Sequence, residues 1–374
     1  MIKNPLPKEI CQERTRPRKE DIRGDYFRDQ TAIIHSMPFR RLKHKTQVFF
    51  APQNDHVCTR IEHVMHVASI AATICKGLMK HGWDLDPELA YAVGLGHDMG
   101  HPPFGHAGEK TLNKILGGGN SFVHEVNSYR IAEYLANNGK GLNLTYAVKD
   151  GIICHNGEKF EQELKPEQEK KDLDIITSRR YIANTYEGVI VRFSDKIAYL
   201  GRDIEDAIIA GFIKIKDVPE QVKKQLGSKN GEIINTLVED VIKNSKDGDS
   251  IKFSDEKFEM LRALRNFNYK YIYGHQEIVD HDHYTTNVLK NLFDHFSTLF
   301  SKYGMETEQY LRSPLKVDRI FGNYIKNMDD FYKTEGYKPN RIVTDYISGM
   351  TDNYAVECMR EIYIPQPIVF NKDV

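Results

Sequence analysis

Apolar residues recur about every 3.6 positions along much of this 374-residue chain, a spacing that places them on one face of a helix. The pattern begins after Asp29 and continues through four further segments, 60–80, 87–99, 124–137 and 144–155. Alternating runs typical of strands are rare, and YIPQPIVF near the C-terminus is the clearest of them. The sequence therefore predicts an all-α fold, a helical bundle with minor irregular or short β elements.

Local signals interrupt this pattern without indicating a domain boundary. Residues 1–30 are polar, rich in arginine and interrupted by proline, which predicts an arm with short helical pieces. Asp86 and Pro87 offer an N-cap and a first helical position for the segment that follows them. The stretch 157–174 is charged and poor in apolar residues, and we interpret it as a solvated excursion because helical patterning resumes at Tyr181.

Composition limits the class of protein. Lys plus Arg (52) and Asp plus Glu (53) nearly cancel to a net charge of −1, so no global field favours nucleic acid or an anionic membrane. The five cysteines are scattered without a CxxC pair, which predicts free thiols in a reducing compartment. No run approaches about 18 apolar residues, and the N-terminus lacks the apolar core of a signal peptide. We expect a cytoplasmic protein with no membrane partner.

The stretch LGHDMGHPPFGHAGEKTL, residues 95–112, concentrates titratable side chains where a helical pattern is interrupted. His97 and Asp98 stand at the end of a predicted helix, where both can converge on a metal ion lying beyond that end. A divalent cation there needs further nitrogen or oxygen ligands from other segments. His63 upstream and Asp195 downstream, each on a patterned helix, are candidates.

The predicted helix that carries Asp195 is largely apolar and is therefore expected to be buried. Asp195, Tyr199 and Asp203 nevertheless fall at positions i, i+4 and i+8, on one face of that helix. Buried carboxylates are costly unless they are paired or bound to a metal. A face that borders a polar cavity would resolve the conflict.

These signals also have simpler interpretations. A His-Asp dipeptide is expected about once by chance in a chain of this size, and a second copy, His281-Asp282, lies in a polar segment. We interpret that copy as a solvated turn ahead of a helix capped by Thr285 or Thr286. Each candidate ligand taken alone could be an ordinary helix histidine or an ion-paired acid, so the metal site depends on the joint pattern.

The order of these candidate ligands resembles that of the HD-domain metal-dependent phosphohydrolases. Longer phrases around them resemble one branch of that superfamily, the deoxyguanosinetriphosphate triphosphohydrolase family. The phrases are RDQTAIIHSMPFRRLKHKTQVF (28–49), TRIEH (59–63), GLGHDMGHPPFGHAGEKTLN (94–113), FVHEVNSYRI (122–131), GLNLT (141–145) and DKIAYLGRDIEDAI (195–208). The resemblance covers about residues 14–212, and a weaker similarity continues through LRNFNYKYIYGHQEI (264–278).

The resemblance implies an α-helical HD-domain bundle that hydrolyses a deoxynucleoside triphosphate, dGTP or several of them, at the α-phosphorus. The products would be a deoxynucleoside and inorganic triphosphate. The family motif places the metal on His63, His97, Asp98 and Asp195. The cofactor would be a divalent ion, Mn²⁺, Mg²⁺ or another transition metal such as Fe, Ni or Co, because histidine and carboxylate ligands accept all of these.

Four catalytic residues are also implied by the resemblance: His101, His106, Glu109 and His124. His106 and Glu109 match the family's catalytic histidine and its acidic partner, and their spacing near a helix start can bring them onto one face. The acid would orient the imidazole and raise its basicity. His106 could act as a base toward water, as an acid toward the leaving 5′-oxygen or as a nucleophile, and the sequence leaves this choice open. The alternative is a capping histidine beside a surface glutamate.

Candidate substrate contacts are Arg60, Lys196, Tyr199, Asp203, Arg265, Tyr269 and Tyr273. Arg60 resembles a family substrate arginine, and Lys196 could reach a phosphate or be a solvated lysine. Tyr199 could stack near the sugar, where Asp203 could accept from the 3′-hydroxyl. Arg265, Tyr269 and Tyr273 recur every four residues and would share one face of a helix, an arrangement that amphipathic packing would also explain.

We expect one domain over residues 1–374, with an N-terminal arm (1–30), an HD core (31–212) and a C-terminal helical part (213–374) that completes the pocket. The resemblance implies a homo-oligomer and allows a nucleotide effector, whereas the near-neutral charge neither supports nor excludes single-stranded DNA.

Two other functions stay open, an HD phosphohydrolase acting on another nucleotide and a catalytically silent nucleotide-sensing scaffold. The phrase HPPFGHAGE, absent from a bare HD signature, argues against the first. The complete set of ligand and dyad residues argues against the second.

Overall fold

A computed structural model describes residues 1–50, 56–157 and 159–365 and confirms the mainly α-helical prediction. The first half of the chain forms these helical elements: α1 (Lys8–Cys11), α2 (Asp25–Ile34), α3 (Met37–Arg41), η1 (Leu42–His44), α4 (Arg60–Met79), α5 (Pro87–Gly96), α6 (Gly105–Ile115), α7 (His124–Arg130), η2 (Ile131–Leu135), α8 (Ala136–Gly139), α9 (Tyr146–Cys154), η3 (Leu173–Ile175) and α10 (Tyr186–Ile209).

The remaining helical elements are η4 (Ile215–Asp217), α11 (Glu220–Leu226), α12 (Asn230–Ser245), α13 (Asp255–Asn268), η5 (Tyr269–Tyr273), α14 (Gln276–Tyr303), α15 (Thr307–Leu311), α16 (Lys316–Asn327), α17 (Asp329–Thr334), α18 (Pro339–Ser348) and α19 (Asp352–Tyr363). The strands of the described residues are two residues long. β1 (Ile2–Lys3) pairs in parallel with β2 (Trp83–Asp84), and β3 (Glu163–Leu164) pairs antiparallel with β4 (Ile251–Lys252).

Helices α4, α5 and α10 pack against one another at the centre of the larger hydrophobic core. The apolar faces expected from the sequence meet there, and α2, α9 and α12 pack around them. Gly94 of α5 lies so close to α4 that a Cβ on it would stand 2.6 Å from Cα of Ala68. This close approach lets two helix segments that carry candidate ligands face each other.

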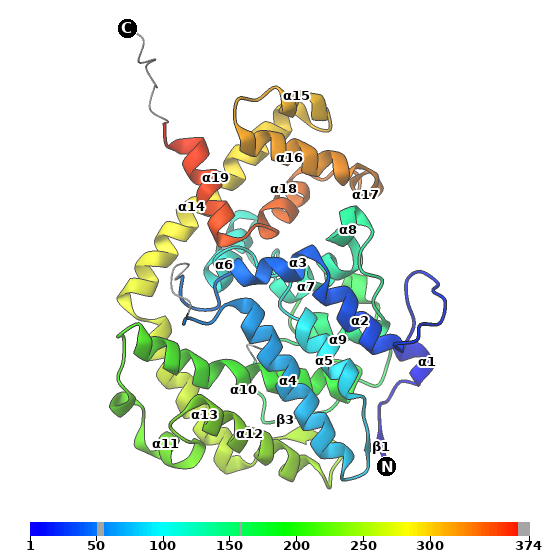
Figure 1. The fold of residues 1–374 in the computed structure, drawn as a ribbon, viewed down its shortest axis with the longest axis vertical. Coiled ribbons are helices and arrows are strands. Elements are labelled where there is room, and N and C mark those ends of the chain that lie inside the picture. Colours follow the sequence, from blue (N-terminus) through cyan, green and yellow to red (C-terminus); the bar gives the residue numbers. More distant parts are fainter. Residues whose placement is uncertain (51–55, 158, 366–374) are drawn as a thin grey trace.

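A second hydrophobic cluster forms around the long helix α14, which runs along one side of the molecule from the α11–α13 group to the α15–α17 group (Figure 1). Its buried aromatic side chains include Phe296, Phe321 and Tyr346. Phe104 and Phe122, which flank α6, belong to this second cluster rather than to the first. The histidine-rich stretch therefore lies where the two clusters meet.

Several local predictions can be compared with this structure. Asp86 caps α5, where its side chain accepts from the Glu88 amide at 2.9 Å, and Pro87 is the first helical residue, as predicted. All five cysteines are free and buried. The predicted strand YIPQPIVF begins inside the last turn of α19, and its residues 366–370 lie outside the described part of the chain. Across the described residues, every helix is too short or too polar to serve as a membrane span.

The prediction for the second His-Asp pair is wrong. His281 and Asp282 lie inside α14, which starts at Gln276, and not in a solvated turn. Thr285 does not cap a new helix, because its hydroxyl donates to the Asp282 carbonyl at 3.0 Å one turn earlier in the same helix. Both members of the pair line the cavity described below.

Candidate active site

Helix α4 presents His63 from its first turn. The Glu62 carboxylate accepts from the amide of Thr59 at 2.8 Å, an arrangement that fixes the start of the helix. His63 is 3 % exposed, and its ring centroid lies 5.4 Å from that of His97, the residue that follows α5. The capping signal in TRIEH therefore determines where the first candidate ligand points.

The end of α5 presents His97 and Asp98 together. Because the Gly94 carbonyl can only accept, the 2.7 Å contact from His97 Nδ1 places the proton on that nitrogen. Nε2 of His97 then carries the lone pair and points to the carboxylates. The helix ends here, so two successive residues can turn toward one point.

Three separate helical segments bring the four predicted metal ligands together. His63 Nε2 lies 3.0 Å from Asp195 Oδ1 and 3.8 Å from Asp98 Oδ2. His97 Nε2 lies 3.5 Å from Asp98 Oδ1 and 3.9 Å from Asp195 Oδ1. All four residues are buried, and separations of this size suit atoms that share one cation.

The donor chemistry also fits a divalent metal. His97 Nε2 is buried with no hydrogen-bond partner among the described residues, which is costly unless a cation occupies the space in front of it. Burial lowers the pKa of His97, so it is neutral, the form that ligates. Burial alone would raise the pKa of Asp98, but His97, His101 and Arg60 hold it well below its usual range. The site thus offers the neutral imidazole of His97 and an ionised Asp98 carboxylate.

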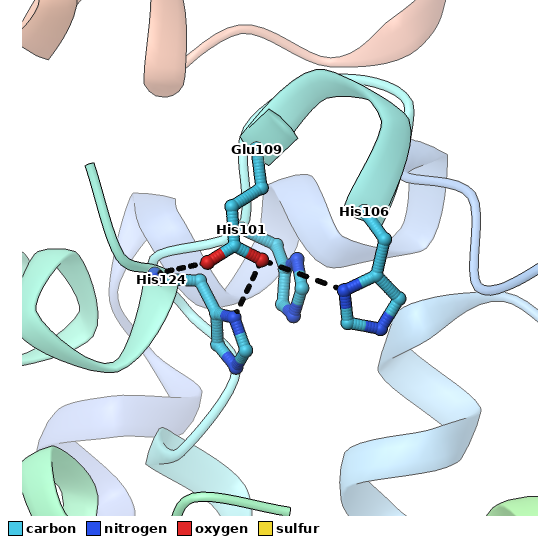
Figure 2. A group of neighbouring side chains, drawn as sticks. All are labelled: His101, His106, Glu109 and His124. Atoms are coloured by element: carbon cyan, nitrogen blue, oxygen red, sulfur yellow. Dashed lines mark hydrogen bonds and ion pairs between the residues drawn. The ribbon is translucent and has the colours of Figure 1, made fainter. Parts of the chain in front are cut away.

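Glu109 stands at the centre of the predicted catalytic group (Figure 2). Its Oε2 lies 3.4 Å from His106 Nδ1 and 2.9 Å from His124 Nδ1. His101 stacks on His124 with ring centroids 3.8 Å apart. The four residues are brought together, but Glu109 is closer to His124 than to the histidine it was predicted to orient. His106 is the exposed member, with 58 % of its side chain accessible.

Sequence reasoning missed Arg179, which lies in the segment between α9 and α10. Its Nη2 donates to Glu109 Oε1 at 2.6 Å and its Nε donates to Glu125 Oε1 at 2.8 Å. Burial alone would raise the pKa of Glu109, but His124 and His106 keep it well below its usual range. Arg179 therefore helps to fix an ionised Glu109. The charged sequence around it has no helical period from which this position could have been inferred.

His155 was also missed. It follows the last residue of α9 just as His97 follows the last residue of α5, and its Nδ1 likewise donates to a carbonyl, that of Ile152, at 2.7 Å. Its ring lies 4.8 Å from the His97 ring and 5.3 Å from the His124 ring. The signal that could have identified it is the shared position, a histidine at the end of a buried helix.

A cavity of about 490 Å³ opens in front of these groups. Five of the seven predicted substrate residues line it: Arg60, Tyr199, Asp203, Tyr269 and Tyr273. Lys196 and Arg265 do not belong to the lining. Lys196 Nζ donates to the Arg192 carbonyl at 3.2 Å, and the Arg265 guanidinium stacks on Phe160 at 4.6 Å. Lys196 lies next to Asp195 on the helix, about 100° away, so it points to another face.

The cavity lining combines buried polar groups with aromatic rings. Asp203 accepts a short hydrogen bond from the Tyr273 hydroxyl, and burial raises the pKa of Asp203 to about 7. Among the aromatic rings, that of His281 stacks on Phe50 at 5.1 Å and lies 6.2 Å from the Phe104 ring. A ligand with a polar sugar-like part and a flat ring would meet matching groups.

Contacts with the C-terminal region fix the loop between α5 and α6, residues 97–104. Phe104 has a left-handed backbone (φ 64°), a strained conformation for a residue with a large side chain. Its amide donates to Asp352 Oδ1 at 2.9 Å, and Asp352 Oδ2 accepts from the Thr46 amide at 2.7 Å. The buried Lys45 ammonium donates to the carbonyls of His101 and Ser348. The loop therefore takes its shape from contacts far away in the sequence.

We expect Gly157→Ala to weaken metal binding. A Cβ at Gly157 would lie 1.7 Å from Asp195 Oδ2, so this carboxylate would have to move away from the other ligands. Metal affinity measured by titration should fall about 10- to 100-fold, as for other changes that misalign a ligand. Gly231→Ala is the matched control, since a Cβ there meets no atom within 4 Å. Unchanged affinity in Gly157→Ala would contradict the placement of Asp195 at the metal.

Comparison with known proteins agrees with the resemblance to HD-domain phosphohydrolases. An HD domain model matches residues 60–200, and a phosphohydrolase-associated domain model matches 251–361. The first range contains all eight predicted metal and catalytic residues. The second contains Tyr269, His281 and Asp352, which complete the cavity and hold its loop.

Curated relatives match most of the chain. A deoxyguanosinetriphosphate triphosphohydrolase-like protein of Caldanaerobacter subterraneus is 39% identical, and the match covers 90% of this chain and 91% of that protein. Proteins with the same description from Desulfatibacillum aliphaticivorans and Clostridium perfringens are 36% and 35% identical. Those matches cover 77% and 85% of this chain and 79% and 87% of the relatives.

Proposed function

The chain belongs to the deoxyguanosinetriphosphate triphosphohydrolase-like family of HD-domain phosphohydrolases, and from this premise we propose that it hydrolyses deoxynucleoside triphosphates to deoxynucleoside and inorganic triphosphate. The observation that carries the proposal is the convergence of His63, His97, Asp98 and Asp195 on one point, beside a cavity that His106 also lines. We further propose Mn²⁺, Mg²⁺ or another divalent transition metal as cofactor.

A divalent ion held by these four residues would neutralise phosphate charge and supply a water molecule of lowered pKa. Arg60 would bind the phosphate groups of the substrate together with this ion. Its Nη1 donates to Asp98 Oδ2 at 2.6 Å, while its Nε and Nη2 have no hydrogen-bond partner among the described residues. Because a buried guanidinium with unpaired donors is costly, a phosphate oxygen is the partner that the geometry suits.

His106 is the proton-transfer group in this proposal. Its imidazole lines the cavity and keeps Glu109 within 3.4 Å, so the carboxylate can hold Nδ1–H and leave Nε2 for the reacting centre. It can then take a proton from water, give one to the leaving 5′-oxygen or attack phosphorus. Glu109 also contacts His124 and Arg179, and these contacts fix the orientation of the carboxylate that holds His106.

The sugar is proposed to lie against Asp203, Tyr273 and Tyr199. Tyr199 is on the Asp195 face of α10, and Asp203 follows one turn later, so the distance from metal to sugar site is set by a single rigid helix. A 3′-hydroxyl would donate to the Asp203 carboxylate. The aromatic wall with His281 would receive the base.

Purified protein incubated with each deoxynucleoside triphosphate and Mn²⁺ or Mg²⁺ tests the proposal, with the products resolved as triphosphate, pyrophosphate and phosphate. Triphosphate release supports it. Release of other products, or turnover of a different nucleotide only, favours an HD phosphohydrolase of another kind. Binding without turnover favours a silent sensor, although the complete set of ligands and dyad residues argues against that function.

We expect the affinity for substrate to rise with pH through the pKa of Asp203, about 7. Below that value the carboxyl is protonated, and above it the carboxylate accepts more strongly from a sugar hydroxyl. KM should therefore fall between about pH 6 and pH 8, one unit either side of the pKa. In Asp203→Asn, KM should no longer fall between these pH values. Its KM at about pH 8 should be about 10-fold higher than that of the unsubstituted protein, since a hydrogen bond to a charged group is worth about 1.5 to 3 kcal/mol.

KM measured across this pH range provides the check, with Asp247→Asn as control because that carboxylate is 86 % exposed and is not part of the cavity lining. An unchanged profile in Asp203→Asn would remove Asp203 from substrate binding. A single domain stays a prediction of the sequence pattern, and a homo-oligomeric assembly and a nucleotide effector stay predictions of the family resemblance.

A further inference from the structure

Two buried carboxylates share one guanidinium behind the predicted catalytic histidine. Arg179 donates from Nη2 to Glu109 Oε1 at 2.6 Å and from Nε to Glu125 Oε1 at 2.8 Å. Glu125 follows His124 in the first turn of α7 and has no role in the function proposed above. Its side chain is only 1 % exposed, and an acid so deeply buried requires a partner of opposite charge.

The two carboxylates depend on Arg179 to different degrees. Glu109 accepts on both oxygens, because the His124 amide donates to Oε1 at 3.0 Å and His124 Nδ1 lies 2.9 Å from Oε2. Glu125 Oε1 accepts from Arg179, but its Oε2 is buried with no hydrogen-bond partner among the described residues. That oxygen is 3.4 Å from His124 Nδ1, which is closer to Glu109. Glu125 therefore relies on Arg179 more than Glu109 does.

Each of the two negative charges opposes the other. Burial raises the pKa of Glu125, and so does Glu109, whereas His124 and Arg179 lower it, and the balance lies below its usual value. Without Arg179, an uncompensated negative charge would stay in a buried site, so one carboxylate would take up a proton at a higher pH. The titratable and charged groups that face the two carboxylates are His101, His106, His124, His155 and Arg179.

Arg179 differs from these imidazoles in two ways. A guanidinium keeps its charge throughout the physiological pH range, and its forked donors can serve two carboxylates at once. The backbone also holds it in place, because the buried Asn156 side chain donates to the Arg179 carbonyl. Asn156 has a left-handed backbone (φ 36°) directly after His155 at the end of α9. The folded chain therefore fixes a permanent positive charge between the two acids.

We propose that Arg179 is a positioning residue whose charge lets Glu109 and Glu125 stay ionised together, so that Glu109 remains an acceptor for His106. The inference deepens the proposed function and rests on it for the role of His106. It also gives Glu125 a role, because a second anion holds the guanidinium where it serves Glu109. A protonated Glu109 would hold His106 Nδ1–H less strongly, and the dyad would lose its orientation.

The test measures the pKa of Glu109 in the full chain by ¹³C NMR, with glutamate labelled at its carboxyl carbon. The loss of one signal in Glu109→Gln assigns the resonance. In Arg179→Gln this pKa should lie about 1 to 3 pH units higher, the usual effect of losing an opposite charge at this distance. Adding Glu125→Gln should lower it again, because one of the two anions is gone. Arg180→Gln is the matched control, since Arg180 is exposed and contacts Tyr181.

Kinetics provide an independent readout. In Arg179→Gln, kcat should fall as the pH drops below the raised pKa of Glu109, and adding Glu125→Gln should reverse this loss. KM and metal content should not change, because Arg179 is neither a predicted metal ligand nor a predicted sugar contact. A purely structural role would lower kcat equally at every pH, and Glu125→Gln would not correct it.

An unchanged pKa of Glu109 in a folded Arg179→Gln would overturn the proposal, and so would a pKa that stays raised after Glu125→Gln is added. Should Arg179→Gln fail to fold, Arg179→Lys takes its place, since one ammonium cannot bridge both acids as the fork does. An unchanged pKa there would overturn the proposal as well. A raised pKa without triphosphate release would count against the proposed function alone, and triphosphate release with an unchanged pKa would count against this inference alone.

Discussion

Asp98→Asn is expected to remove bound metal and to lower triphosphate release at least about 100-fold, since loss of a ligand should cost no less than loss of the partner behind a ligand. The carboxylate contacts Arg60 at 2.6 Å and stands among the imidazoles of the site. An amide offers one weakly ligating oxygen and no charge. The Arg60 guanidinium, 1 % exposed, would also lose its ion pair.

The same substitution should lower thermal stability, because removing one partner of a buried ion pair costs about 3 to 5 kcal/mol. Elemental analysis, product assays and thermal unfolding followed by circular dichroism measure the three effects separately. Asp84→Asn is the matched control, since that carboxylate is 60 % exposed and pairs loosely with Lys3 at 3.9 Å. A folded Asp98→Asn that retains its metal and turnover would refute the assignment of the metal site.

His106→Ala should lower kcat by about 10²- to 10⁴-fold, the range for loss of a proton-transfer group, without changing metal content. The metal should stay because His106, which contacts Glu109, is not one of the four predicted ligands. With a side chain 58 % exposed, its removal should leave folding intact. Kinetic assays beside elemental analysis check both parts, and His35→Ala, at an exposed histidine, is the control. Retained turnover would remove His106 from the reaction.

The candidate metal ligands could be named from the sequence because their order resembles the HD-domain motif. The 3.6-residue period placed His63 and Asp195 on helices and His97 at a helix end, as the structure has them, but only the fold shows that these helices meet. The i, i+4, i+8 stripe of α10 correctly indicated a polar cavity, since Tyr199 and Asp203 line it.

The errors have physical reasons. The sequence around His281 resembles a polar turn because the first turns of α14 border the cavity, and the apolar period appears only from Leu289 onward, where the helix packs in the second cluster. Lys196 was named because it follows Asp195, but adjacent helix positions point to different faces, and it is not part of the cavity lining; its contact with substrate stays a prediction. Arg179 lies in a segment whose path is set by ion pairs with Glu109 and Glu125, and such contacts between distant residues leave no periodic signal.

The bond between the Phe104 amide and Asp352 has a consequence for partial chains. A fragment that stops before α19 would keep every predicted metal ligand and the dyad, yet the strained turn ahead of α6 would lack its anchor. Turnover would then report whether the far end of the chain is intact and docked. Proteolytic loss of that end would silence the enzyme while its histidines and carboxylates remain in the polypeptide.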